Sequence, residues 1–144
     1  SKKRIFVTPV TNQENTLDEL FHNLFGEFVE NVEPIDGYYD IAAHGSSDSI
    51  ELFTTPINSG TLARLIVERG DYKKGTPVRL LSCFTGDDSR GTCFAQELAN
   101  MLETEVIAPD FELLISSRGR LGKPDVRGNY ESIKISDFRR FKPK

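Results

Sequence analysis

Short apolar segments alternate with helical segments from residue 5 to about residue 108, and this alternation constrains the fold more than any other feature. In the helical segments, the apolar residues recur at helical spacing. The predicted strands cover residues 5–7, 38–43, 78–82 and 105–108, and the predicted helices cover residues 16–31, 58–69 and 92–103. Such alternation is typical of a mostly parallel sheet. We therefore predict an α/β fold with helices on both faces of the sheet.

Beyond residue 110 the pattern changes, and we expect the strands there to extend the sheet as a mixed edge with antiparallel members. Apolar or alternating residues predict strands at residues 112–116 and 131–135. Between them, three glycines and a proline predict a long loop over residues 118–128. We also predict a short hairpin or an edge strand at residues 50–53.

Length and composition limit the classes of protein that this chain can belong to. With 144 residues, it has the length of one domain, residues 1–144, with one core. A formal net charge of −4 argues against general nucleic-acid binding. No apolar run approaches the roughly 20 residues of a membrane span, and no secretory signal stands out. The opening Ser1-Lys2-Lys3 leads us to expect a domain excised from a larger protein.

Charge is distributed unevenly along the chain. Residues 5–63 contain ten carboxylates and no Lys or Arg, whereas residues 118–144 carry a net charge of +6. Two explanations are open: the basic tail meets an acidic partner, or it neutralises the acidic half of its own domain. Reversing Arg139 and Arg140 to Glu distinguishes the two explanations. If the melting temperature falls while association with the partner is unchanged, the tail serves internal charge balance.

Two chemically capable side chains directly follow two of the predicted strands. His44 follows the strand at 38–43, and Cys83 follows the strand at 78–82. Ligands gather at the carboxyl ends of parallel strands. If these strands are neighbours, ~4.8 Å apart, we expect the thiol and the imidazole to lie within ~3–6 Å. A nearby histidine can accept the proton of a nucleophilic thiol. The N–H groups of Gly45 and Cys83 are candidate donors to an oxyanion.

The residues around these two positions resemble the caspase-like cysteine peptidases of clan CD, which include caspases, gingipains, separase and the autoprocessing domains of large bacterial toxins. A closer resemblance, over roughly residues 38–110, is to the caspase-like peptidase domains at the C-termini of bacterial polymorphic toxins, such as Rhs-type and contact-dependent inhibition proteins. The motifs that carry it are Asp40-Ile-Ala-Ala-His-Gly45, Leu80-Leu-Ser-Cys-Phe-Thr-Gly86, Phe94-Ala-Gln-Glu-Leu-Ala99 and Val106-Ile-Ala-Pro109.

This resemblance implies a three-layer caspase-like sandwich and a cysteine endopeptidase that needs no cofactor and no metal. It makes His44 the catalytic histidine and Cys83 the nucleophile, with the Gly45 and Cys83 N–H groups as the oxyanion donors. Caspases flank their cysteine with a Gln-Ala-Cys-x-Gly motif. Here Ser82-Cys83-Phe84 stands instead, so a caspase-type specificity for aspartate is not implied.

Five further residues are candidates for contact with the substrate, and they favour opposite substrate charges. Asp87 and Asp88 follow the nucleophile and would favour a basic side chain, unless they only solvate their loop. Arg118 and Arg120 lie in the predicted long loop and would favour an acidic side chain. Asp48, in the loop after His44, is also a candidate third catalytic residue.

We predict that the domain is the effector of a bacterial toxin, delivered as part of a larger secreted protein and active in the cytoplasm of the target cell. Its expected partners are a protein or peptide substrate and a cognate immunity protein. We expect it to bind neither nucleic acid nor a membrane. One alternative is an autoprocessing domain that cuts its own polypeptide in cis. Others are a catalytically silent caspase-like binding module and an enzyme of other acyl chemistry, such as deamidation.

Overall fold

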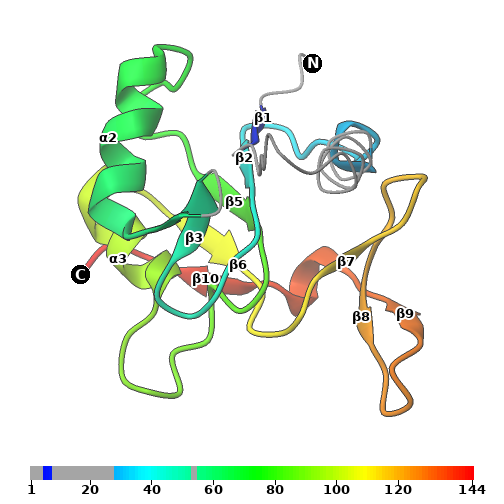
Figure 1. Ribbon diagram of the computed structural model, residues 1–144. Helices are drawn as coiled ribbons and strands as arrows, with labels where there is room; N and C mark the ends of the chain where they lie inside the picture. Colours follow the sequence, from blue (N-terminus) through cyan, green and yellow to red (C-terminus); the bar gives the residue numbers. More distant parts are fainter. Residues whose placement is uncertain (1–4, 8–27, 53–54) are drawn as a thin grey trace.

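A five-stranded sheet forms the centre of the computed structural model, which describes residues 5–7, 28–52 and 55–144 (Figure 1). The strand order is β1 (Ile5–Val7), β2 (Tyr39–Ala42), β5 (Val78–Leu81), β6 (Val106–Ala108) and β10 (Arg139–Phe141). The first four strands are parallel, and β10 pairs antiparallel with β6. The predicted α/β class, with a mostly parallel sheet and an antiparallel edge, is therefore confirmed.

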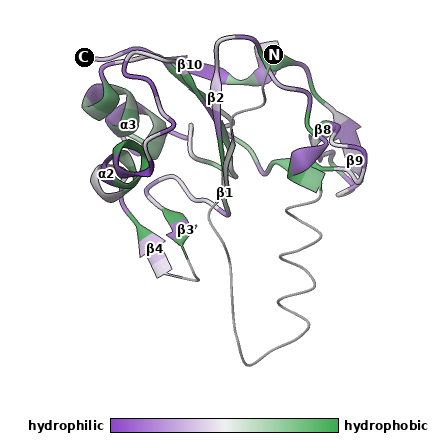
Figure 2. Ribbon diagram, turned by 90° about the horizontal axis from the view of Figure 1, so that it is seen from above, coloured by the Kyte–Doolittle hydropathy of each residue, from purple (hydrophilic) through white to green (hydrophobic). Residues whose placement is uncertain are grey.

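Helices α2 (Ser59–Arg69) and α3 (Phe94–Leu102) pack on the same face of this sheet. Figure 2 shows them on one side of β2, with β8 and β9 on the other. Successive strand residues point to opposite faces, so Ile41 belongs to the core under the helices and Ala42 to the core on the other face. Residues 28–30 are helical and belong to that second face, but the rest of the predicted helix at 16–31 lies almost entirely outside the described residues.

The two helices on the first face end where local sequence signals predict. The Asn58 side chain caps α2 by accepting a hydrogen bond from the Thr61 N–H at 2.9 Å. Gly70 ends α2 in a left-handed conformation, with φ of 88°. Helix α3 follows Cys93, close to its predicted start. Among the described residues, no helix has both the length and the apolar character that a membrane span requires.

Two small antiparallel sheets flank the central one. β3 (Ile50–Leu52) and β4 (Thr55–Ile57) form the short hairpin that the sequence predicts. β7 (Leu114–Ile115), β8 (Leu121–Pro124) and β9 (Tyr130–Ser132) form a separate three-stranded sheet, which Figure 1 shows standing away from α2 and α3. The expectation that the predicted strands at 112–116 and 131–135 extend the central sheet is therefore wrong, and the strand that does extend it, β10, was not predicted.

The prediction of a continuous loop over 118–128 is wrong, because β8 lies inside it. Glycine and proline are rare in strands, and Gly122 and Pro124 therefore concealed this one. Gly122 is needed because the Tyr130 ring of β9 lies over it: a Cβ there would be 2.4 Å from the ring. The predicted strand at 131–135 is also displaced, since β9 ends at Ser132 and a 3-10 helix, η1 (Ile135–Asp137), follows.

A buried ion pair links β2 and β5. Asp40 and Arg79 are direct neighbours in the register, and their side chains are 2% and 4% exposed. The guanidinium donates two hydrogen bonds to the carboxylate, at 2.7 and 2.6 Å, and a third to the Glu33 carbonyl at 3.1 Å. This pair therefore ties the segment before β2 to the middle of the sheet.

The basic tail meets acidic groups of its own domain. Arg139 forms an ion pair with Asp88, and Arg140 binds Glu105 at 3.1 Å. The hydrogen bond from Arg139 lowers the pKa of Asp88. The pKa of Glu105 is lowered chiefly by the hydrogen bond from the Tyr38 hydroxyl. For these two arginines the contacts favour internal charge balance, and association with an acidic partner stays a prediction.

Reversal of both Arg139 and Arg140 to Glu is expected to lower the melting temperature, because it places like charges opposite Asp88 and Glu105. The loss should be larger at low salt, where screening is weak. The folded-state pKa values of both carboxyls are lowered, so the wild-type stabilisation is present at neutral pH and disappears as the pH falls through those values. Thermal melts at several salt concentrations and pH values check this, and equal melting temperatures would contradict it.

Candidate active site

The pairing of β2 with β5 brings His44 and Cys83 to the same end of two neighbouring strands. It pairs Tyr39 with Val78 and Ala42 with Leu81, an offset of 39 residues. His44 and Cys83 have the same offset, and each lies two residues beyond the end of its strand. The ladder continues in this direction, since the Ala43 N–H donates to the Leu81 carbonyl at 3.3 Å. The condition set by the sequence, that the two strands are neighbours, is met, and both residues lie just beyond the carboxyl ends of these strands.

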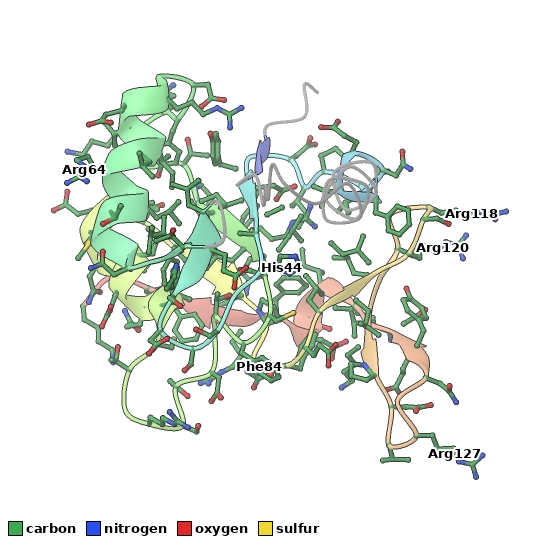
Figure 3. All side chains as sticks on the ribbon, in the orientation of Figure 1. His44, Arg64, Phe84, Arg118, Arg120 and Arg127 are labelled. Atoms are coloured by element: carbon green, nitrogen blue, oxygen red, sulfur yellow. The ribbon has the colours of Figure 1, made fainter. Side chains whose placement is uncertain are left out.

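His44 and Cys83 line one pocket of about 220 Å³. Figure 3 shows where His44 lies at this edge of the sheet. Most of the pocket wall is aliphatic, and it comes partly from the segment before β7. The other lining residues are Ala43, Leu81, Ser82, Glu112, Leu113, Leu114 and Ile115. The expected separation of ~3–6 Å between Cys83 Sγ and an imidazole nitrogen stays a prediction.

The Cys83 thiol is hydrogen-bonded to the backbone of Leu113. The Leu113 N–H donates to Sγ at 3.3 Å, and the thiol donates to the Leu113 carbonyl at 3.6 Å. Burial raises the pKa of this thiol above its ordinary value, and the Glu112 carboxylate raises it further, although the Leu113 N–H opposes both. The neutral thiol is therefore favoured at neutral pH, and nucleophilic attack requires a base.

Gly45 packs closely against the backbone after Cys83. A Cβ at Gly45 would lie 2.9 Å from the Cys83 carbonyl oxygen and 3.0 Å from the side chains of Ser82 and Thr85. Glycine therefore lets the His44 segment approach the Cys83 segment. Within the described part of the chain, no backbone carbonyl accepts a hydrogen bond from the N–H of Gly45 or of Cys83. Both groups remain candidates for holding an oxyanion.

The amino-acid sequence matches the model of one known protein family. A family model described as a domain of unknown function (DUF8616) matches residues 11–123. The chain belongs to the DUF8616 family. The matched region contains both His44 and Cys83, together with the Glu112–Leu113 segment that contacts the thiol. No curated protein matches the chain.

Phe84, beside the nucleophile candidate of this DUF8616 domain, has a conformation that no sequence pattern predicts. It directly follows Cys83 and has a left-handed backbone with φ of 60°, which costs a non-glycine residue about 1–2 kcal/mol. Its N–H donates to the Phe111 carbonyl at 3.0 Å, and its side chain is 41% exposed. Backbone strain of this kind is concentrated at functional sites. No sequence signal marks it, because the residue is not a glycine.

None of the three acidic candidates lines the Cys83 pocket of the DUF8616 domain. Asp48 accepts a hydrogen bond from the Ser46 hydroxyl at 2.9 Å and lines a different pocket, of about 190 Å³. Asp87 accepts from the Ser89 N–H at 3.0 Å, and Asp88 binds Arg139. The structure does not bring these carboxylates together with the thiol.

The two basic candidates also lie away from the thiol. Figure 3 shows Arg118 and Arg120 at the turn between β7 and β8, well separated from His44. Arg120 lines a larger pocket of about 460 Å³, on the side of the DUF8616 domain where β8 meets the segment before β2. This pocket shares no lining residue with the Cys83 pocket. The charged residue that does line the pocket with Cys83 is Glu112, and no sequence pattern singles it out.

Proposed function

We propose that this DUF8616 domain is a cysteine endopeptidase with Cys83 as its nucleophile and His44 as its base. One observation carries the proposal: both residues occupy matching positions beyond two adjacent parallel strands and line the same pocket. The motifs around them also resemble those of caspase-like peptidases. The elevated pKa of Cys83 makes a neighbouring base necessary for attack.

The proposed reaction proceeds through an acyl-enzyme. His44 accepts the thiol proton while Cys83 Sγ forms a bond to the peptide carbonyl carbon. The N–H groups of Gly45 and Cys83 donate to the oxyanion that develops. The C–N bond then breaks as His44 returns the proton to the leaving amine. Water, deprotonated by His44, adds to the thioester and releases the carboxylate product and the free thiol.

The biological role that we propose is that of a bacterial toxin effector within a larger delivered protein. It would act in the cytoplasm of the target cell, and a cognate immunity protein would inhibit it in the producing cell. A caspase-like three-layer architecture is part of the same proposal. The α/β fold and the motifs that resemble toxin peptidase domains support it.

The proposal is tested by N-terminal labelling proteomics on cells that express wild-type protein or the Cys83→Ala variant. We expect new protein N-termini only with wild-type, because only an intact thiol can form the acyl-enzyme. New termini confined to the expressed polypeptide itself would favour autoprocessing in cis. Mass increases of about 1 Da in target proteins, without fragments, would instead indicate deamidation. New termini that persist at equal abundance in the Cys83→Ala sample would refute the peptidase proposal.

An acyl probe that reacts with activated thiols distinguishes an enzyme from a silent binding module. Wild-type protein should be labelled at Cys83, and the His44→Ala variant should be labelled much more slowly, because the base is missing. Equal labelling of the two proteins would favour a silent module.

A further inference from the structure

Among the described residues, a single carboxylate lines the Cys83 pocket. Apart from Cys83 and His44, the sole titratable lining residue is Glu112. The rest of the wall is almost wholly aliphatic. Its aliphatic members are Ala43, Leu81, Leu113, Leu114 and Ile115. The pocket therefore combines an apolar wall with a single carboxylate at an exposed position.

The Glu112 carboxylate has no cationic partner within the described residues. None of the ion pairs there includes it, although Lys123 lies close enough to cover the neighbouring Phe111 ring at 5.5 Å. Its negative charge disfavours the thiolate and so raises the pKa of Cys83. A carboxylate that disfavours the thiolate in the free enzyme is consistent with a cationic substrate, because the charge of the substrate would offset that of the carboxylate.

We propose that the Cys83 pocket recognises a lysine or arginine side chain of the substrate next to the bond that is cut, and that Glu112 pairs with its cationic group. This specificity rests on the proposed peptidase function. The aliphatic wall suits the methylene stem of such a side chain, and the carboxylate suits its head. Binding would neutralise Glu112 and thereby make the Cys83 thiolate easier to form. A cationic substrate thus promotes its own cleavage, and an acidic one is rejected.

Cleavage of a peptide library by wild-type, Glu112→Gln and Glu112→Lys tests the specificity. Wild-type should cut mainly after Lys or Arg. In Glu112→Gln, kcat/KM for those peptides should fall about 10- to 100-fold, the value of a charge-assisted pair, while kcat/KM for peptides with Leu or Ala changes little. Glu112→Lys should prefer acidic residues. Asp110→Asn is the matched control, because this exposed carboxylate is two residues away and does not line the pocket.

A second measurement does not depend on peptidase activity. Cys83 is labelled with cationic aminoethyl or anionic sulfonatoethyl methanethiosulfonate, in a Cys93→Ser background. The ratio of the cationic to the anionic rate should fall about tenfold in Glu112→Gln and stay unchanged in Asp110→Asn. The pH midpoint of Cys83 alkylation by iodoacetamide should also move down in Glu112→Gln, because a negative charge near the thiol is lost.

The two proposals fail in different ways. An unchanged reagent ratio in Glu112→Gln, or Cys83-dependent cleavage without preference for Lys and Arg, overturns the role of Glu112 and leaves the peptidase intact. Absence of any Cys83-dependent cleavage, together with the predicted change in reagent ratio, overturns the peptidase but keeps Glu112 as a cation-recognising group beside the thiol.

Discussion

Replacement of Cys83 with alanine is expected to lower the rate of peptide cleavage by about 10³-fold or more while the fold stays intact. Loss of a nucleophile that acts with its base as one unit typically has effects of this size or larger. The structural cost should be small, about 1 kcal/mol, because the thiol makes only two long hydrogen bonds to the Leu113 backbone. Steady-state kinetics and the melting temperature of the variant check both statements.

The matched control is Cys93→Ser. Cys93 is also a free thiol, but it is buried at 2% exposure and precedes α3 as its N-terminal cap residue. Serine is a preferred residue at that position, so this variant should fold and keep its activity. Equal losses in Cys83→Ala and Cys93→Ser would show that activity depends on core packing and would end the assignment of Cys83 as the nucleophile.

Replacement of Asp40 with alanine is expected to lower the free energy of unfolding by about 3–5 kcal/mol, because it leaves the buried Arg79 charge without its partner. The pair lies in the middle of the sheet, where the two side chains are almost completely excluded from water. Arg79→Ala should cost a similar amount, since it strands the Asp40 carboxylate. Urea unfolding of the purified variants measures both losses.

The double variant Asp40→Leu/Arg79→Met shows whether the loss of stability comes from an unpaired charge or from altered packing of the sheet. Removal of both charges leaves none uncompensated, and an apolar replacement of a buried ion pair is often neutral or even stabilising. The double variant should therefore be more stable than either single variant. The single variants Asp40→Leu and Arg79→Met complete the cycle, and losses that simply add in the double variant would contradict the coupling between the two side chains.

Sequence patterns predict best those features whose decisive interactions are local. Helix α2 begins after Asn58 and ends at Gly70 as predicted, because its cap hydrogen bonds join residues only three positions apart. The short apolar runs Ile41-Ala42-Ala43 and Leu80-Leu81 indicate β2 and β5, because strands covered on both faces are rich in apolar side chains. The positions of His44 and Cys83 at the ends of those strands followed from the same runs.

Other features depend on residues far apart in the sequence, and no local pattern predicts them. Strand β8 contains a glycine and a proline that local rules read as a loop, and only the Tyr130 ring on the next strand shows why Gly122 belongs there. Glu112 carries no local signal at all. It acquires a chemical meaning because the segment before β7 folds over a thiol about 30 residues earlier in the chain, where Leu113 binds Sγ.

The amino-acid sequence by itself determined the α/β class, the helix limits and the two residues most capable of chemistry, because periodicity and capping act over a few residues. Only the tertiary structure decided that His44 and Cys83 line one pocket, that Asp40 pairs with Arg79, and that the charged tail meets Asp88 and Glu105. These contacts join positions that are 35 to more than 50 residues apart. Strand pairing and side-chain burial determine these contacts, and no local sequence pattern predicts which distant residues become neighbours.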